Sequence, residues 1–398
     1  MKKFFGYIRN IIVVLLLLYV TSIFVDIRIE GVPLKSIYET SAKETYKFID
    51  SLVDRIKSEP EITEFSIKKT EDDLYQYEVK IKYVDVDELV SITIGNIVYD
   101  DFEITKDKSI ITASFLETIT FEEGISNKSY TISSIKYQRN DSEKSLNTNV
   151  VGYAFKSLDL DIVEDKKQSV VGIHACNSEG GFTICNSWGS GVIFKSESQT
   201  VESILGDYNL YTYYILTNAH VVEGGSIFDI YYKAAKLNDQ ATVVGTYTVN
   251  TDLAILELET RNVLEVLEDT QFDTKEALPV YKGQTVFSVG SPVGIQNFNK
   301  FLEGTIESLN HTVYLKKNPN NPDSVLCVDG CNSFSTTAAL GQGSSGGAMF
   351  DTAGNIIGIH FAGDEDNTIG FEIYMETVLI AIDTILNQTA DSSRIYIN

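Results

Sequence analysis

The stretch Gly341-Gln-Gly-Ser-Ser-Gly-Gly-Ala-Met-Phe350 sets two adjacent serines in a run of glycines, directly before an apolar segment. Such a run is either an ordinary loop or a backbone that curls tightly around one reactive hydroxyl group. Glycine suits the second role because it adopts the positive φ angles that a tight turn needs. The stretch alone does not decide between the two interpretations, so other segments must supply the partners of a reactive serine.

Two earlier segments carry such partners. Leu216-Thr-Asn-Ala-His-Val-Val222 ends an apolar strand pattern on a histidine, and Asn250-Thr-Asp-Leu-Ala-Ile-Leu-Glu-Leu258 opens another strand pattern with an aspartate. Taken singly, such a histidine is more often structural and such an aspartate is usually a cap or a turn residue. In the order His220, Asp252 and Ser345, however, the three segments supply a complete catalytic triad for acyl transfer.

The chemistry explains why these residue types are needed. A serine hydroxyl is a poor nucleophile at neutral pH, so His220 would take its proton, and Asp252 would hold the imidazole in the required tautomer. The backbone N–H groups of Gly343 and Ser345 are predicted to form the oxyanion hole, because the absence of a side chain at position 343 lets them converge. No metal or cofactor is required.

At these residues the sequence resembles the HtrA (DegP-like) branch of the trypsin-like, chymotrypsin-fold serine proteases. The family's Thr-Asn-x-His-Val-Val matches 217–222, and its Asp-Leu-Ala-x-Leu matches 252–256. Its Gly-Asn-Ser-Gly-Gly-Ala-Leu matches 343–349, with Ser344 in place of Asn and Met349 in place of Leu. The match implies that Ser345, and not Ser344, is the nucleophile.

The resemblance covers about residues 165–390 and implies two six-stranded β-barrels with the active site in the cleft between them. It implies protein or peptide substrates, and it leaves a homo-oligomer open. Short strand patterns with glycine turns fit this mainly β fold, and Glu376 to Asn387 is predicted as a closing helix. The segment after Ser345 is too short for the PDZ domain that many HtrA proteins carry, so none is expected. A polar insertion is predicted from His311 to Asn332.

Substrate contacts are predicted by the same resemblance at Leu340, Ile359, His360 and Phe361. Bacterial glutamyl endopeptidases and picornavirus cysteine proteases carry a histidine in a similar Gly-Ile/Met-His motif, and its ring donates a hydrogen bond to a Glu or Gln before the scissile bond. His360 could do the same here. The alternative is a preference for a small aliphatic residue, as in HtrA relatives, which the nearby Ala338-Ala-Leu340 favours.

The N-terminal segment has the pattern of a membrane anchor. Ile11 to Val25 is almost wholly apolar, and extending the helix back to Phe4 allows it to span a hydrocarbon core of about 30 Å. Lys2 and Lys3 predict a cytoplasmic tail, so residues 1–28 would be a single-pass anchor with the protease domain outside the cell membrane. A cleaved signal peptide is the alternative, but the sequence after Val25 lacks a pair of small residues for cleavage.

Between the anchor and the protease domain, residues 29–150 are predicted to form a small α+β domain of unknown role. A helix is expected over 33–58 and strands from about Ile62, with a linker over 139–149. The four cysteines predict two local disulfides, Cys176–Cys185 and Cys327–Cys331, and a zinc site at these cysteines is a weaker alternative.

Composition restricts the function further. The 398-residue chain has 32 basic and 56 acidic side chains, a formal charge of −24 that disfavours nucleic acid as a partner. The sequence therefore predicts a membrane-anchored, extracytoplasmic serine endopeptidase, with a role in protein quality control implied by the resemblance. Two alternatives stay open at this point: a non-catalytic binding or sensing module on a protease fold, and a chaperone-like holdase.

Overall fold

The structure is a computed structural model. It describes residues 28–29, 32–33, 59–71, 73–83, 86–107, 109–180, 182–204, 206–315, 326–327, 329–388 and 396–397. Within these ranges the chain forms two compact units, one from 59–70, 74–117 and 130–152, the other from 71–73, 118–129 and 153 onward. Near the start of the chain, β1 (Arg28–Ile29) pairs with β2 (Val32–Pro33).

The first unit consists of two four-stranded sheets, with strand orders β3-β4-β8-β7 and β10-β9-β5-β6. Alternation produces these strands. In β4, for example, Tyr75, Tyr77, Val79 and Ile81 are buried while the residues between them are more exposed. The strands are β3 (Glu61–Glu71), β4 (Leu74–Lys82), β5 (Glu88–Ile94), β6 (Ile97–Tyr99), β7 (Glu103–Asp107), β8 (Ile110–Thr118), β9 (Asn127–Arg139) and β10 (Ser142–Phe155).

The structure bears on the linker and the helix that were predicted for the N-terminal part. The linker predicted over 139–149 is wrong, because Asn140 and Asp141, at φ angles of 52° and 59°, form a tight turn between β9 and β10. Paired positive φ angles are the geometry of a two-residue hairpin turn, which Asn and Asp tolerate well. The predicted helix over 33–58 lies outside the described residues, apart from Pro33, so the helical part of the α+β prediction stays a prediction.

The predicted membrane anchor, residues 1–28, also lies outside the described residues, apart from Arg28. Among the helices that the structure does describe, none has the length and apolar character needed to cross a membrane.

The second unit begins with α3 (Leu160–Lys166) and the 3-10 turn η1 (Lys167–Ser169), followed by the first barrel. Its strand order is β14-β11-β12-β13-β16-β15, and pairing of β14 with β15 closes it, while β23 (Tyr396–Ile397) adds in parallel to β15. The strands are β11 (Val170–Glu179), β12 (Phe182–Val201), β13 (Tyr208–Thr217), β14 (Ile227–Tyr232), β15 (Ala235–Tyr247) and β16 (Leu253–Thr260).

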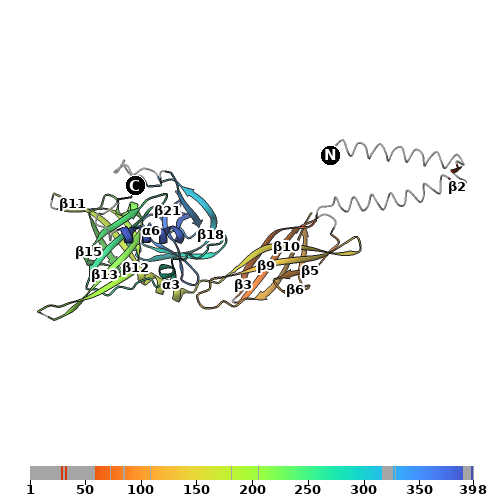
Figure 1. The fold of residues 1–398 in the computed structure, drawn as a ribbon, viewed down its shortest axis with the longest axis horizontal. Coiled ribbons are helices and arrows are strands. Elements are labelled where there is room, and N and C mark those ends of the chain that lie inside the picture. Colours follow the sequence, from red (N-terminus) through yellow and green to blue (C-terminus); the bar gives the residue numbers. More distant parts are fainter. Residues whose placement is uncertain are drawn as a thin grey trace. The chain divides into compact units, whose positions relative to one another are not determined.

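The second barrel closes in the order β17-β18-β19-β22-β21-β20. Its strands are β17 (Thr285–Gly290), β18 (Lys300–Val313), β19 (Cys331–Thr336), β20 (Ala348–Asp351), β21 (Ile356–Gly363) and β22 (Gly370–Tyr374). The short elements α5 (Thr270–Thr274) and η2 (Ile295–Asn297) flank β17, and α6 (Met375–Gln388) packs beside β15 and β21 (Figure 1). The predicted double barrel and closing helix are therefore confirmed.

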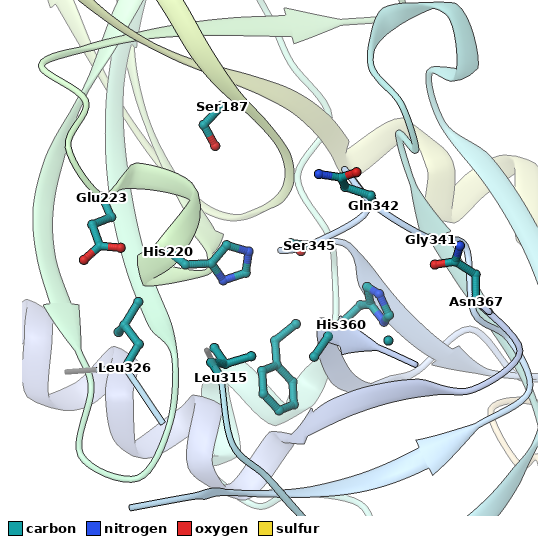
Figure 2. Close-up of a pocket in the computed structure, with 13 residues that line it drawn as sticks. Ser187, His220, Glu223, Leu315, Leu326, Gly341, Gln342, Ser345, His360 and Asn367 are labelled. Carbon is teal, nitrogen blue, oxygen red and sulfur yellow. The ribbon is translucent and has the colours of Figure 1, made fainter. Parts of the chain in front are cut away.

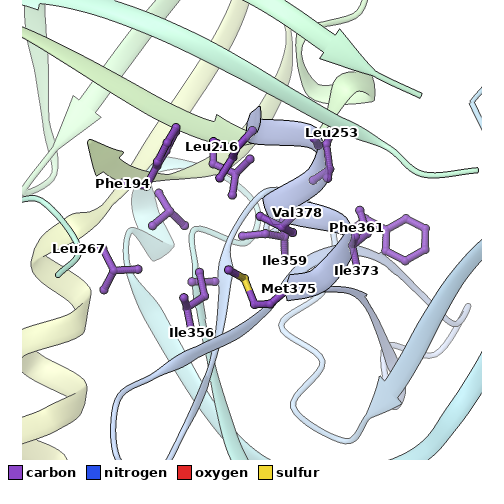
Figure 3. Packing of buried hydrophobic residues seen from close by; sticks show 14 of the residues in the cluster. Phe194, Leu216, Leu253, Leu267, Ile356, Ile359, Phe361, Ile373, Met375 and Val378 are labelled. Atoms are coloured by element: carbon purple, nitrogen blue, oxygen red, sulfur yellow. The ribbon is translucent and has the colours of Figure 1, made fainter. Parts of the chain in front are cut away.

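One hydrophobic cluster joins the two barrels. Figure 3 shows Leu216 and Leu253 of the first barrel beside Ile359 and Ile373 of the second, with Val378 of α6 among them. All five side chains are fully buried. Burial of apolar surface contributes roughly 25 cal/mol per Å², so this shared core holds the barrels together. Loops from both barrels can then hold one site.

Both predicted disulfides are present. Cys176–Cys185 bridges β11 and β12, and Cys327–Cys331 closes a short loop at the start of β19. The side chain of His174 lies within 4.8 Å of the first pair of sulfur atoms. Because those sulfurs are bonded to each other, the observed pairing is a disulfide and not the zinc site considered as the alternative.

Candidate active site

His220 and Asp252 are brought together by the register of two neighbouring strands. His220 lies in the short helix α4 (Ala219–Val222), directly after β13, and Asp252 directly precedes β16. Antiparallel pairing sets Thr217 opposite Ala254, so the end of one strand meets the start of the other. The sequence separation between the histidine and the aspartate is thus closed by ordinary sheet pairing.

The contacts of Asp252 fix the imidazole of His220. Its Oδ2 lies 2.5 Å from Nδ1 of His220, and its Oδ1 accepts the backbone N–H of His220 at 2.9 Å. Asn218 secures the aspartate in turn, because its Nδ2 donates to the Asp252 carbonyl at 2.8 Å. With Nδ1 engaged, Nε2 is the nitrogen left to exchange a proton with another group.

The electrostatics of the pair follow from this geometry. Asp252 is fully buried, whereas 31% of the His220 side chain is exposed. Burial lowers the pKa of His220, but the charge of Asp252 and its hydrogen bond to the ring more than offset burial. The pKa of His220 is therefore raised above its ordinary value of 6.5.

The serine loop is held by both barrels. The Ser345 carbonyl accepts the N–H of Ser190 of β12 at 2.7 Å, and the N–H of Gly346 donates to the His360 carbonyl of β21 at 2.8 Å. Gly346 is at a φ of +84°, and a Cβ there would lie 2.1 Å from the Ser190 oxygen. Glycine is thus required for the loop to approach β12 this closely.

The backbone at Gly343 is oriented by a contact of the preceding peptide. The Gln342 carbonyl accepts the N–H of Val293 at 2.8 Å. In a planar trans peptide the N–H points opposite to the carbonyl, so the Gly343 N–H points away from Val293. Gly343 itself is at a φ of +95°.

The neighbouring amides have internal acceptors: those of Ser344 and Gly347 donate to the carbonyls of Gly341 and Ser344. Within the described part of the chain, no acceptor is present for the amides of Gly343 and Ser345. These are the two amides that the sequence predicts to form the oxyanion hole. Their geometry suits the binding of an external oxygen.

Ser345 and His220 line the same cavity, which has a volume of about 490 Å³ (Figure 2). The figure shows the His220 ring directed toward Ser345. The lining residues come from both barrels and from the loops around them: Ser187, His220, Glu223, Leu315, Leu326, Gly341, Gln342, Ser345, His360, Phe361, Ala362, Gly363 and Asn367.

The predicted substrate contacts are divided by the strand geometry of β21. His360 and Phe361 line the cavity, but Ile359 is fully buried in the shared core, and Leu340 lies outside the lining. Successive residues of a strand point to opposite faces, so a cavity-facing His360 directs Ile359 inward. The register shift between His360 and Ala362 interrupts this alternation and lets Phe361 take part in the lining.

Several residues at or directly behind the cavity were not predicted from the sequence. Leu315 and Leu326 both lie within the predicted polar insertion, so described parts of the insertion border the site. Asn367 extends from the loop between β21 and β22, and Glu372 of β22 lies behind His360, with Oε1 3.0 Å from Nδ1. A carboxylate within the apolar segment Gly370–Tyr374 was the available signal for Glu372.

Comparison with known proteins agrees with this geometry. Residues 189–359 match the trypsin-like peptidase domain family. This segment contains the histidine, the aspartate and the serine described above.

Curated relatives are Do-like serine proteases. The chain is 30% identical over 239 residues to HtrB of Bacillus subtilis, a match that covers 57% of this chain and 46% of the relative. It is 33% identical over 174 residues to HtrA of Lactococcus lactis subsp. cremoris, covering 44% and 37%. It is 28% identical over 255 residues to HtrA of B. subtilis, covering 59% and 51%.

The chain therefore spans about half the length, or less, of these relatives. Residues 189–359 accordingly match the trypsin-like peptidase domain, and the chain is similar to the HtrA (Do-like) serine proteases.

Proposed function

We propose that this chain is a serine endopeptidase that hydrolyses peptide bonds through an acyl-enzyme on Ser345. The observation that carries this proposal is the pairing of His220 with the buried Asp252 in the cavity that Ser345 lines. Similarity to known proteins supports the same reaction, since the curated relatives are named serine proteases.

The first half-reaction forms the acyl-enzyme. Nε2 of His220 takes the proton of Ser345 as Oγ attacks the peptide carbonyl, and Asp252 stabilises the imidazolium that results. The negative charge that develops on the carbonyl oxygen is accepted by the N–H groups of Gly343 and Ser345. His220 then gives its proton to the leaving amine as the peptide bond breaks.

The second half-reaction reverses these roles. A water molecule loses a proton to His220 and attacks the acyl carbon, and the same two amides stabilise the oxyanion. Collapse returns the proton to Ser345 and releases the carboxylic acid product. Each step uses only groups of this chain and water.

We further propose that the protease domain spans 165–390, is tethered by the apolar segment within 1–28, and acts outside the cell membrane on proteins in quality control. The N-terminal sequence pattern supports the tether, and the HtrA relatives support the functional setting. Residues 29–150 would then form the spacer or accessory domain between tether and protease, and assembly into a homo-oligomer remains compatible with this arrangement.

Labelling with a serine-directed fluorophosphonate tests the proposed nucleophile. The full-length wild type should be labelled and should hydrolyse peptides, whereas Ser345→Ala should lose both properties. Ser344→Ala is the matched control, because Ser344 is 1% exposed and its hydroxyl is bonded to the Gly341 carbonyl. That variant should keep detectable labelling. Equal labelling of wild type and Ser345→Ala would disprove the assignment.

A further inference from the structure

The cavity beside Ser345 contains a second histidine–carboxylate pair that the hydrolytic mechanism does not use. His360 and Glu372 lie directly opposite each other on β21 and β22, with Nδ1 and Oε1 3.0 Å apart. The side chain of His360 is 5% exposed and that of Glu372 is fully buried. His360 lines the cavity, so it separates the carboxylate of Glu372 from any bound substrate.

The protein backbone fixes the position of this pair. His360 donates its N–H to the Gly347 carbonyl and accepts the N–H of Gly346, so its main chain is bonded on both sides to the serine loop. Gly370 leaves room for the pair, because a Cβ there would lie 2.8 Å from Oε1 of Glu372 and 3.2 Å from Cε1 of His360. The ring therefore keeps a constant place beside Ser345.

Hydrogen bonding to Glu372 determines which ring nitrogen serves the substrate. Since Nδ1 faces Glu372, Nε2 on the other side of the ring is left for the cavity. Within the described residues, the hydrogen bond of the ring is the one at Nδ1, and Nε2 has no hydrogen-bond partner. Oε2 of Glu372 likewise has none there, so the charge of this carboxylate depends on His360 for compensation.

The total charge of the pair determines what Nε2 can bind. Two arrangements are neutral overall: an imidazolium beside a carboxylate, and an imidazole beside a carboxylic acid whose proton points to Nδ1. In both, Nε2 carries a hydrogen and donates. The third arrangement leaves Nε2 as an acceptor, but it encloses a net negative charge in the barrel, which is costly.

A neutral donor favours one class of substrate side chain. A carboxylate entering the cavity would find a hydrogen bond but no net positive charge, and it would approach Glu223 on the cavity wall and a chain of net charge −24. A side-chain amide has an acceptor oxygen and brings no charge. An aliphatic side chain would leave the buried N–H unpaired.

Asn367 supplies a second polar contact at the cavity. Asp364 holds this loop, because its carboxylate accepts the N–H and hydroxyl of Thr368 and the N–H of Ile369. Asn367 itself is at a φ of 54° and borders the cavity beside Gly341. A Cβ added to Gly341 would lie 3.3 Å from the side-chain amide of Asn367. An amide in the protein can both donate to and accept from an amide in the substrate.

We propose that the His360–Glu372 pair, with Asn367, makes this cavity a receptor for a side-chain amide, so that the chain cleaves after Gln in preference to Glu or an aliphatic residue. Glu372 acts as a positioning residue, because it reaches the substrate only through His360. The inference rests on the proposed endopeptidase function and assigns the substrate class of that same site.

The test compares full-length protein on three peptides that differ only in the residue before the scissile bond, namely Gln, Glu or Leu. We expect kcat/KM for the Gln peptide to exceed the other two values by about tenfold or more. In His360→Val the ratio of Gln to Leu cleavage should fall by a similar factor. Wild-type protein that cleaves the Glu peptide as well as the Gln peptide would overturn the proposal.

Glu372→Gln gives a result that a merely structural role would not produce. Without the carboxylate, Nδ1 of His360 loses the partner that orients the ring, so KM for the Gln peptide should rise by a larger factor than kcat falls, and the Gln-to-Leu ratio should decrease. Glu303→Gln is the matched control, because it removes an exposed carboxylate of β18 and should follow the wild type.

A second variant keeps the proposal testable if Glu372→Gln fails to fold, as judged by circular dichroism. Asn367 is exposed, so Asn367→Ala should fold, and it should lower the Gln-to-Leu ratio severalfold. Unchanged ratios in Asn367→Ala and His360→Val would overturn the inference. Fluorophosphonate labelling separates this failure from that of the proposed function: labelled protein without the Gln preference refutes only the substrate class.

Discussion

Two histidine–carboxylate pairs face one cavity, and they differ in exposure and hydrogen bonding. In the first, Asp252 has both oxygens engaged by His220, while the histidine side chain is 31% exposed. In the second, Glu372 engages His360 through Oε1 only, and the histidine side chain is 5% exposed. The ring proposed to exchange protons is accessible, whereas the ring proposed to recognise a substrate side chain is enclosed.

The comparison shows that residue type alone does not assign a role. Both pairs place a buried carboxylate on Nδ1 and leave Nε2 toward the cavity. The difference lies in what surrounds each pair: His220 follows a strand end on a short helix, and His360 sits within a paired strand whose backbone is bonded to the serine loop. The two proposed roles, proton transfer for His220 and recognition for His360, therefore follow from position within the fold.

Removing the imidazole ring of each pair should give the largest difference between the two histidines. His220→Ala is expected to lower kcat by roughly 10⁶-fold on every peptide, because the general base is lost. His360→Val should instead change the ratio between substrates while hydrolysis stays measurable. Steady-state kinetics on the Gln and Leu peptides check this. Similar losses in the two variants would mean that both rings serve the chemical step.

The next largest effect is expected when the carboxylate of the first pair, Asp252, is replaced. Asp252→Asn should lower kcat by about 10⁴-fold, because the amide favours the wrong tautomer of His220 and no longer stabilises the imidazolium. Thermal melting should show that the variant still folds. A loss confined to one of the test peptides would contradict the assignment, since this carboxylate acts on the chemistry and not on recognition.

Two glycine-to-alanine variants, one at the oxyanion hole and one beside the His360–Glu372 pair, should separate the two roles further. Gly343→Ala should cost roughly 10²- to 10³-fold in kcat, because a Cβ there would lie 2.9 Å from the Val293 nitrogen and would displace the oxyanion amide. Gly370→Ala crowds Glu372 and His360 and should mainly lower the Gln-to-Leu ratio. Kinetics on both peptides, with active-site titration to count working molecules, distinguish these outcomes.

The smallest expected effect is a shift in pH dependence. His220 must be neutral to accept the serine proton, and its pKa is raised above 6.5 by Asp252 despite the opposing effect of burial. Protonation therefore persists to higher pH, and activity on the Leu peptide should fall as the pH drops through a midpoint above 6.5. In Asp252→Asn the residual activity should have its midpoint at lower pH, because burial then acts without the compensating charge. A wild-type midpoint below 6.5 would contradict the assigned pairing.

Sequence reasoning found the residues that local motifs mark and missed those that depend on register. His220, Asp252 and Ser345 each stand in a short diagnostic segment, and the two disulfides join cysteines close in sequence. Glu372 becomes the partner of His360 only through strand pairing, and Asn367 reaches the cavity through a loop that Asp364 shapes. Neither relation has a linear signature.

Two errors have similar physical causes. The polar segment 139–149 has the composition of a linker, yet cross-strand pairing makes most of it part of a hairpin. The assignment of Ile359 to substrate contact ignored the alternation along β21, which directs its side chain into the core that joins the barrels. Composition and motif proximity do not reveal which face of a strand a residue occupies.

The most direct test of the central claim is to trap the acyl-enzyme. The full-length protein is mixed with an activated ester, quenched in acid within milliseconds to seconds, and examined by intact-mass and peptide-fragment mass spectrometry. We predict one acyl group per chain, located on Ser345, and none in His220→Ala over the same interval. An acyl group on Ser344 or another residue, or hydrolysis that persists in Ser345→Ala, would contradict the claim that His220 and Asp252 activate Ser345.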